Sequence, residues 1–381
     1  MRLPAGIRQA VEDALSLQFG GRIQIADEVQ NFSPSSVFRC TLQSSGSGVP
    51  ATVVVRVLRE GTVRSGRTGL HNERIALEFL TAIGSSLAPR CLAGSSAADF
   101  LVTEDLGNYP SLLDLLLGKD AEAARQGSVD FAHGLGKLHA RTAGRSTELQ
   151  NILPVMRVPV AEHWRQVRDA AAQLELPTPL GVDDDVEALT RRLAEPNACV
   201  ALSSGDCSVV NCKITSDGVR FFDFEDACFR HALIDAAVLR YPYPTGGPPW
   251  RLPLELALQI EAAYRAELAQ TCPITQDNNF YERGMAAACA AWTIIRLARL
   301  PKVDAGPDRD PWLLLLPDWS APVPARSRRR QLVAILETCV ASAHHAGAFE
   351  AFAVWCESLA TALRERWHEA AEERPLYPAF L

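Results

Sequence analysis

A short hairpin pattern between acidic residues places the strongest constraint on how this chain folds; it lies within ALSSGDCSVVNCKITSDGVRFFDFEDA. Residues Val209–Thr215 and Val219–Asp223 have the composition of strands, and the Ser-Asp-Gly triplet between them is a turn signal. With the hairpin centred on Asp217, Asn211 lies six residues before the centre and Asp223 six residues after it. Because cross-strand partners point to the same face with Cβ atoms about 5 Å apart, the pattern predicts that these two side chains face each other.

An amide oxygen and a carboxylate placed in this way suit a magnesium ion, which proteins usually hold with one or two oxygens plus substrate phosphates and water. Asp206 lies five residues before Asn211, on a predicted loop, where a carboxylate can accept a proton from a substrate hydroxyl. Glu225 and Asp226 extend the acidic cluster. A carboxylate there either helps to bind the magnesium ion or is solvated, and we slightly favour solvation. Positioning groups, cations and a base are the parts that phosphoryl transfer needs. We therefore interpret Ser204–Asp235 as the catalytic core of a phosphotransferase.

The first 108 residues have the pattern of a small α+β lobe. Three strand-like runs, joined by short turns, predict an antiparallel meander, and two amphipathic helices and one more strand accompany it. The expected strands are Arg22–Val29, Ser36–Leu42, Ala51–Leu58 and Phe100–Thr103, and the expected helices are 7–18 and Leu70–Ile83. Residues 1–108 are thus predicted to form an N-terminal lobe with a nucleotide-binding sheet.

Residues 109–381 are predicted to form a larger and mostly helical lobe. Strand-rich residues 198–223 interrupt the helical patterns, and the proline-rich stretch 301–324 is expected to be a loop. The expected helices are 112–118, 129–143, 160–173, 184–194, 253–269, 280–299, 328–346 and 349–371. The predicted fold class is therefore α+β, with a small antiparallel-sheet lobe and a helical lobe that carries the catalytic loop, the metal-binding hairpin and an acceptor pocket.

Charge and cysteine content exclude several classes of function. The formal net charge of −7 gives no support for nucleic-acid binding, which needs basic surfaces. The ten cysteines contain no CxxC pair, so we expect reduced thiols rather than a disulfide framework or a zinc site. No apolar run approaches the ~20 residues that span a bilayer, and the N-terminus has no signal-peptide pattern. We therefore expect a cytoplasmic protein with no membrane or nucleic-acid partner.

Two motifs resemble the aminoglycoside phosphotransferase family of kinase-like enzymes. SGDCSVVN resembles the HGDxxxxN loop of that family, and FFDFEDACFRHALIDAA resembles its φIDFEDAxxGHPLxDLA stretch, where φ is apolar. Upstream, HNERIALEFLTAIGSSLAPRCLAG, LVTEDLGN and LGKLHARTAG resemble its Glu-bearing helix, its interlobe hinge and its Leu-His helix. The matches follow the family order over residues 20–270. The resemblance implies a two-lobed, protein-kinase-like fold that uses ATP and Mg²⁺.

Carried over by position, the resemblance implies roles for five residues of the helical lobe. Asp206 would be the catalytic base. Asn211 and Asp223 would bind magnesium. Asp235 would brace the catalytic loop from inside a helix, and His139 would pack under the same loop.

The resemblance also implies the residues that bind the nucleotide. Glu73 would pair with the basic residue of the third strand, which is Arg56 where the family usually has Lys. Arginine keeps the charge and can pair with phosphate, but its guanidinium is bulkier and forked. Glu104 and Leu106, in the hinge, would present backbone groups to adenine.

Two further departures from the family pattern concern serines. No Gly-rich phosphate loop is present; QNFSPSSVF occupies its place, where Ser33, Ser35 and Ser36 offer hydroxyl and backbone donors or form an ordinary polar turn. Ser204 replaces the usual His of the catalytic loop, which is mainly a brace. The half of the site that grips the nucleotide is thus altered, whereas the half that performs the chemistry is intact.

The short spacing after Asp223 favours a small-molecule acceptor. Only eleven residues separate Asp223 from Asp235, whereas a protein kinase usually inserts a long activation loop there. From Arg240 to the end there are sixteen acidic and fifteen basic residues, so no acidic excess marks a pocket for a polycation. The acceptor therefore stays open. It is an aminoglycoside or other antibiotic, which phosphorylation would inactivate, or it is a sugar or an amino alcohol.

The leading hypothesis is an ATP-dependent O-phosphotransferase acting on a hydroxyl of a small molecule. The alternative is a kinase-like binding or regulatory protein with impaired catalysis, which Arg56, Ser204 and the missing Gly-rich loop favour. GTP in place of ATP also stays open. The sequence does not indicate an oligomeric state or a protein partner.

Overall fold

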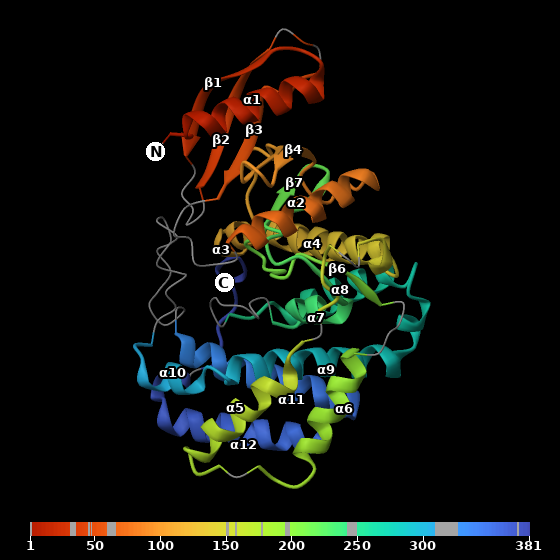
Figure 1. Cartoon of the computed structure of the whole chain (residues 1–381). Coiled ribbons are helices and arrows are strands. Elements are labelled where there is room, and N and C mark those ends of the chain that lie inside the picture. Colours follow the sequence, from red (N-terminus) through yellow and green to blue (C-terminus); the bar gives the residue numbers. More distant parts are fainter. Residues whose placement is uncertain are drawn as a thin grey trace.

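A five-stranded antiparallel sheet forms one end of the molecule, and helices stack away from it in tiers (Figure 1). The sheet order is β1-β2-β3-β5-β4, with strands β1 (Ile23–Gln30), β2 (Ser36–Ser44), β3 (Thr52–Val57), β4 (Cys91–Ser95) and β5 (Phe100–Glu104). The computed structural model describes the chain except residues 1, 31–35, 45, 47, 59–65, 150–151, 157, 177, 195–198, 242–249, 309–326 and 372.

The first three strands form the predicted meander, and β5 then pairs with β3. Strand β4 at the edge is an addition that the strand pattern alone did not predict. Helix α1 (Ala5–Phe19) packs on one face of the sheet through Val11 and Leu15. Along β3, the buried residues Val53, Val55 and Val57 alternate with partly buried ones. Because side chains of a strand alternate between faces, Arg56 points to the opposite face from these valines.

The remaining part of the chain is mostly helical, as predicted. Its helices are α3 (Leu112–Leu117), α4 (Ala121–Thr142), α5 (Val160–Ala172), α6 (Val182–Ala194), α7 (Ala232–Ala236), α8 (Leu254–Leu268), α9 (Asn278–Leu297), α10 (Leu300–Ala305), α11 (Arg328–Ala346) and α12 (Glu350–Arg366). Short 3₁₀ turns are Ser146–Glu148, Ala237–Leu239, Pro273–Gln276, His368–Ala370 and Pro378–Phe380. Two small antiparallel pairs join β6 (Val200–Ser203) to β9 (Cys228–His231), and β7 (Cys212–Thr215) to β8 (Gly218–Phe221). The α+β, two-lobed fold is thereby confirmed.

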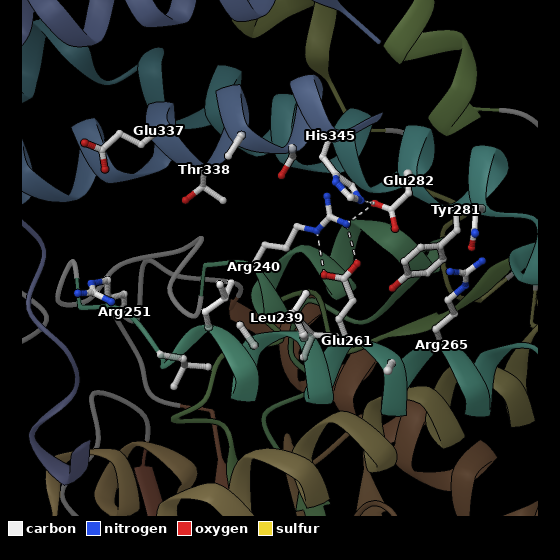
Figure 2. A pocket seen from close by; sticks show the side chains of 18 of the residues that line it. Leu239, Arg240, Arg251, Glu261, Arg265, Tyr281, Glu282, Glu337, Thr338 and His345 are labelled. Carbon is white, nitrogen blue, oxygen red and sulfur yellow. Dashed lines mark hydrogen bonds and ion pairs between the residues drawn. The ribbon is translucent and has the colours of Figure 1, made fainter. Parts of the chain in front are cut away.

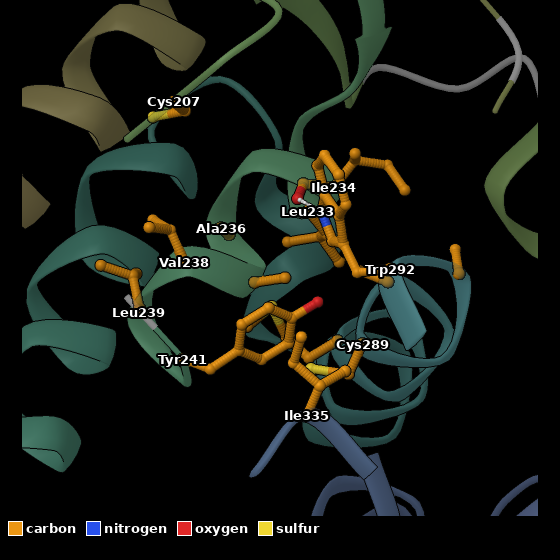
Figure 3. Close-up of a cluster of buried hydrophobic side chains, with 14 of the residues drawn as sticks. Cys207, Leu233, Ile234, Ala236, Val238, Leu239, Tyr241, Cys289, Trp292 and Ile335 are labelled. Carbon is orange, nitrogen blue, oxygen red and sulfur yellow. Dashed lines mark hydrogen bonds between the residues drawn. The ribbon is translucent and has the colours of Figure 1, made fainter. Parts of the chain in front are cut away.

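Helix α9 is the centre of the helical lobe's core. Residues Ala286–Ala291 are all buried, and their small side chains let α7 and α11 approach closely. Figure 3 shows Trp292 of α9 beside Tyr241 and Ile335 within this core. The indole Nε1 of Trp292 donates a hydrogen bond of 2.8 Å to the Ile234 carbonyl in α7. The core thus fixes α7, which follows the β7–β8 hairpin and β9 along the chain.

Helix α2 (Gly66–Ala82) connects the two lobes. Its buried residues Leu77 and Leu80 belong to the large core of the helical lobe, whereas α1 and the sheet form a separate cluster. Phe79 also makes an edge-on contact with Phe229, with ring centroids 6.4 Å apart. Because α2 packs with both parts, the division after residue 108 stays a prediction.

One loop prediction is wrong in part. Residues Leu300–Ala305, which overlap the proline-rich stretch 301–324, form helix α10. Pro301 lies in the first turn, where a missing N–H group costs the helix nothing. The rest of that stretch, from residue 309, lies outside the described residues.

All ten cysteines carry free thiols, as expected. Of the helices that the structure describes, none combines the length and the apolar character needed to cross a membrane.

Candidate active site

The segment between β6 and β7 is a tight loop that holds Asp206 and Asn211 together. The Asn211 side-chain Nδ2 donates to the Asp206 carbonyl at 3.1 Å, and the Ser208 N–H donates to the same carbonyl at 2.8 Å. The Asn211 N–H donates to the Ser208 carbonyl at 3.0 Å. Because the Asn211 amide uses its nitrogen within the loop, its oxygen is the atom that would bind a cation.

Gly205 is a site residue that the sequence interpretation did not single out. Its φ of +87° is in the left-handed region, and a Cβ at this position would lie 2.2 Å from the Asp226 carbonyl oxygen. Only glycine therefore lets the loop pass under the segment that follows Asp223. The Gly-Asp pair formed by Gly205 and the predicted base Asp206 was the signal that could have identified it.

A buried polar chain supports this loop from below. His139 of α4 bonds to the Tyr264 hydroxyl at 2.9 Å through Nδ1 and to Asp235 Oδ2 at 3.2 Å through Nε2. Arg230 donates to Asp235 Oδ1 through Nε at 2.9 Å, and its Nη2 also reaches the Gly205 carbonyl at 3.1 Å. Asp235 and His139 thus lie under the loop, in the places that the resemblance implied.

The charges of Asp235 and Arg230 in this buried polar network stabilise each other. Burial alone raises the pKa of Asp235, but Arg230 and the hydrogen bond from His139 outweigh it and lower the pKa to about 2. Asp235 is therefore a charged carboxylate paired with the buried guanidinium of Arg230. Arg230 was not predicted as a brace; with Ser204 at the position of the family's His, Arg230 is the residue that holds the Gly205 carbonyl.

The predicted register of the hairpin is wrong by one residue. The observed pairs run from Cys212↔Phe221 to Thr215↔Gly218. Continued by one residue, this register places Asn211 opposite Phe222, whose N–H donates to the Asn211 carbonyl at 3.1 Å. The turn has two residues rather than three, because Gly218, at φ +105°, already begins the second strand. Asn211 and Asp223 are consequently not direct cross-strand partners.

Asp223 is instead aimed by an unusual backbone conformation. It follows the end of β8 and has φ of +64°, a left-handed value that is uncommon outside glycine and enriched in Asp and Asn. Its side chain is 34% exposed, and Oδ1 accepts a hydrogen bond of 2.9 Å from Arg56 Nη1. Strained backbone of this kind gathers at functional sites, so the conformation adds to the case for Asp223 as a site residue.

Arg56 joins carboxylates of both lobes. It forms the expected pair with Glu73 of α2, and it also pairs with Asp223 and with Glu225. The expectation that Glu225 is solvated is wrong, because its carboxylate is bound by the Arg56 Nη2 and its side chain is only 21% exposed. Asp226 is exposed, as expected.

The site carries more negative than positive charge. Burial opposes protonation of Arg56, but Glu73, Asp223 and Glu225 raise its pKa. Burial also raises the pKa of Glu73 to about 7, against the attraction of Arg56. Three carboxylates share one guanidinium, so Arg56 alone does not neutralise this part of the site.

The magnesium prediction still rests on Asn211 and Asp223. No group of three or more His, Cys, Asp or Glu side chains that would hold a metal occurs within the described part of the chain.

The hinge residue Glu104 connects the lobes through its side chain. Its carboxylate accepts from Arg220 of β8 at 2.8 Å and from the Arg90 N–H at 3.2 Å. The Glu104 N–H donates to the Arg90 carbonyl at 3.0 Å, so adenine recognition at this residue would have to use its carbonyl. Leu106 follows β5 and is half-buried in the segment between the lobes. Roles for both in nucleotide binding stay predictions.

The predicted phosphate-contacting serines fall largely outside the described residues. Ser33 and Ser35 lie among residues 31–35, and Ser36 begins β2 without a described side chain. The structure thus brings together Asp206 and Asn211 in one loop, and Arg56 with Glu73 and Asp223 between the lobes.

Comparison with protein families assigns the chain to a family of phosphotransferases. The model of a family described as the phosphotransferase enzyme family matches residues 35–271, which is more than half of the 381-residue chain. Among curated proteins, none matches the sequence.

The solved structures that are similar to the chain include an aminoglycoside phosphotransferase, a choline kinase and a fructosamine-3-kinase candidate. Aminoglycoside phosphotransferase APH(2″)-Ib, ADP-bound, is 15% identical over 92% of this chain and 99% of its own, with a TM-score of 0.46. A choline kinase from Cryptosporidium parvum Iowa II is 13% identical over 91% and 93%, with a TM-score of 0.46. A fructosamine-3-kinase candidate from Thermobifida fusca YX-ER1 is 15% identical over 76% and 92%, with a TM-score of 0.44.

Proposed function

The chain belongs to the phosphotransferase enzyme family, and from this premise we propose that it transfers the γ-phosphoryl group of ATP to a hydroxyl of a small molecule. One observation carries the proposal. The catalytic loop holds Asp206 and Asn211 together through the Asn211 Nδ2 bond of 3.1 Å to the Asp206 carbonyl. These are the residue types, at the spacing, that a base and a cation ligand require.

Asp206 is the proposed base. Its carboxylate would accept the proton of the acceptor hydroxyl, while the buried Arg230–Asp235–His139 chain keeps the loop in place. The Asn211 amide oxygen and the Asp223 carboxylate would hold Mg²⁺. That ion, when bound, would supply positive charge against the phosphate oxygens.

Arg56 is the proposed phosphate contact of the N-terminal lobe. Glu73 and Glu225 hold its guanidinium between the lobes, which supports a position near the phosphates. The Glu104 carbonyl and the Leu106 backbone are the proposed adenine contacts. Ser33, Ser35 and Ser36 stay proposed donors to phosphate oxygens.

The acceptor class is proposed as a small hydroxylated compound, with an aminoglycoside or other antibiotic first. Modification of an antibiotic would make the protein a resistance enzyme. A sugar or an amino alcohol is the alternative acceptor. The balanced charge of the C-terminal part keeps both acceptor types open.

A second candidate function is a kinase-like binding protein without transfer. The pairing of Arg56 with Asp223 favours it, because this guanidinium occupies a carboxylate that would otherwise bind the metal. In the first candidate, Asp223 must exchange Arg56 for Mg²⁺; in the second, the pair persists.

A phosphotransfer assay with a panel of acceptors separates the two candidates. The full chain is incubated with Mg-ATP and an aminoglycoside, a sugar or an amino alcohol, and both ADP and phosphorylated product are measured. We expect product from at least one acceptor, in a one-to-one ratio with ADP. Thermal stabilisation by Mg-ATP without product from any acceptor would instead favour the binding protein.

A further inference from the structure

Gly205, the residue before the proposed base, is held on both sides by groups that are anchored on one buried carboxylate. Its N–H donates to the Ser203 hydroxyl oxygen at 2.9 Å, and its carbonyl accepts from Arg230 Nη2 at 3.1 Å. Ser203 and Arg230 both donate in turn to Asp235, which is buried. Because the Gly205 carbonyl belongs to the same planar peptide unit as the Asp206 nitrogen, Arg230 fixes the plane from which the base projects.

This peptide unit depends on its partners because it follows a glycine. Gly205 has φ of +87° and no Cβ, so its own backbone preference selects no single orientation of the carbonyl. The carbonyl of Asp206 is fixed separately within the loop, by Asn211 Nδ2 at 3.1 Å and by the Ser208 N–H at 2.8 Å. Arg230 thus orients the peptide unit that enters Asp206, and the loop orients the one that leaves it.

Two departures from the family motifs meet at this peptide unit. The loop HGDxxxxN has His where this chain has Ser204, and the stretch φIDFEDAxxGHPLxDLA has glycine where this chain has Arg230. Ser204 directly precedes Gly205, whereas Arg230 lies on β9, opposite Ala201 of β6. Both changed residues are buried. A large polar side chain is therefore lost from the loop, and another enters the same place from the neighbouring strand.

Arginine has the donor geometry that this place requires. Its Nε and Nη2 both donate to Asp235, and Nη2 also reaches the Gly205 carbonyl, so one planar group is bound at two points. A lysine would keep the positive charge beside Asp235, but its single ammonium lacks the rigid fork. A neutral residue would leave the buried carboxylate without its cationic partner, which is costly.

We propose that Arg230 is a positioning residue for Asp206, and that it replaces from β9 the brace that the family's loop histidine provides at position 204. The guanidinium, fixed by Asp235, holds the Gly205 carbonyl and thereby directs the Asp206 carboxylate toward the acceptor hydroxyl. The kinetic consequence rests on the proposed function, whereas the coupling between Arg230 and the loop does not.

The kinetic test compares two arginine-to-lysine variants of the full chain. Arg230→Lys keeps the charge and loses the fork, so kcat should fall at least about tenfold while the KM for ATP stays within about twofold. Arg240→Lys is the matched control, because Arg240 is a partly buried arginine of the same lobe that bonds to Glu261 and Glu282 instead (Figure 2). It should keep kcat within about twofold. Equal kcat in the two variants would overturn the positioning role.

Hydrogen exchange tests the coupling without any acceptor. The amides of Ser208 and Asn211 donate within the loop, and mass spectrometry of peptides covering 204–211 follows them in the unliganded chain. In Arg230→Lys they should exchange at least about fivefold faster, with α9 unchanged, whereas Arg240→Lys should leave the loop as it is. Unchanged loop exchange in Arg230→Lys would overturn the proposal. Faster exchange in a chain that phosphorylates no acceptor would contradict the proposed function and still support the coupling.

A double variant tests whether Arg230 stands in for the missing histidine. Arg230→Gly leaves Asp235 without its guanidinium, so kcat should fall at least about 100-fold or the chain should fail to fold. Ser204→His together with Arg230→Gly restores both residues of the family motifs. This double variant should recover at least about tenfold in kcat, or folded protein where Arg230→Gly alone gives none. A double variant no better than Arg230→Gly would overturn the exchange of braces.

Discussion

At the scale of single residues, Arg56 is the position where the two lobes depend on each other. Its guanidinium pairs with Glu73 of α2 and with Asp223 and Glu225 of the segment after β8. A lysine, with one compact ammonium, offers no forked geometry to satisfy three carboxylates at once. The arginine thus offsets the mutual repulsion of the three carboxylates.

Removal of Arg56 should expose this dependence. In Arg56→Ala the three carboxylates lose their common partner, and the free energy of unfolding should fall by about 3–5 kcal/mol. If the group suits a divalent cation, millimolar Mg²⁺ should raise the melting temperature of the variant more than that of the unsubstituted chain. Differential scanning fluorimetry with and without Mg²⁺ measures both effects.

Arg74→Ala, which removes the partner of the half-exposed Glu78 on the same helix, is the matched control and should change stability by about 1 kcal/mol or less. An Mg²⁺ response no larger in Arg56→Ala than in Arg74→Ala would contradict the proposed cation site.

His231 should give stability a pH dependence. Burial lowers the pKa of His231 to about 4, from an ordinary value near 6.5. A histidine with a depressed folded pKa binds fewer protons when folded, so stability is lost as pH falls from about 6.5 to 4, by about 3 kcal/mol. His231→Asn keeps an acceptor for the Leu233 N–H at the start of α7 and removes the titrating group.

Urea unfolding at several pH values measures how steeply the free energy of unfolding changes with pH. The unsubstituted chain should lose stability between pH 6.5 and 4 more steeply than His231→Asn. Parallel pH profiles for the two would mean that His231 is not the group responsible.

Sequence reasoning reached some of these residues and not others, for physical reasons. Asp206 and Asn211 are close in sequence and share a loop, so their spacing was enough to predict their association. Glu225 and Gly205 depend on the left-handed backbone at Asp223 and on the approach of Asp226. No local periodicity signals either feature, because both follow from how separate segments meet.

At the scale of elements, the β7–β8 hairpin is held in place by its fit against α4. Gly134 faces Val219 so closely that a Cβ at this glycine would lie 1.9 Å from Val219 Cγ1. The hairpin begins and ends beside Asn211 and Asp223, so its distance from α4 sets the position of both.

Gly134→Ala should therefore displace the hairpin. Overpacking of this kind costs about 1–3 kcal/mol, measured by urea unfolding, and phosphotransfer should fall as well because the two proposed metal ligands, Asn211 and Asp223, move. The double variant Gly134→Ala/Val219→Ala removes the clash and should recover most of both losses.

Gly6→Ala on α1 is the control, since a Cβ there meets nothing within 4 Å and alanine favours the helix. Failure of the double variant to recover stability would place the cost of Gly134→Ala elsewhere.

Elements were predicted well where periodicity decides and poorly where a turn decides. The long helices follow from their 3.6-residue apolar repeat, and α11 has the bounds that the pattern indicates. Helix α4 begins at Ala121 rather than at the expected 129, and α12 ends at Arg366 rather than at the expected 371. The hairpin itself was predicted, but its register was not, because a two-residue and a three-residue turn both suit Ser216, Asp217 and Gly218. Strands β4 and β9 have only five and four residues, which is too short for an alternation of apolar and polar residues to stand out in the sequence.

At the scale of the whole molecule, contacts across the lobes bring the proposed nucleotide-binding residues and the proposed catalytic residues together. Arg220 of β8 bonds to the hinge residue Glu104 at 2.8 Å, and the Phe221 N–H donates to the Leu87 carbonyl at 2.7 Å. With the Arg56–Asp223 pair, these bonds set the distance between the sheet and the catalytic loop. The lobes therefore present one composite site rather than two separate ones.

The central claim is that Asp206 is the base of this composite site, and the turnover of Asp206→Asn tests it most directly. Asp217→Asn, in the exposed turn of the neighbouring β7–β8 hairpin, is the matched control. With an acceptor that the unsubstituted chain phosphorylates, Asp206→Asn should lose about 10²–10⁴-fold in kcat, with ATP affinity by calorimetry nearly unchanged. Asp217→Asn should retain full turnover. Equal turnover in the two variants would contradict the assignment of Asp206 and, with it, the proposed phosphotransfer site.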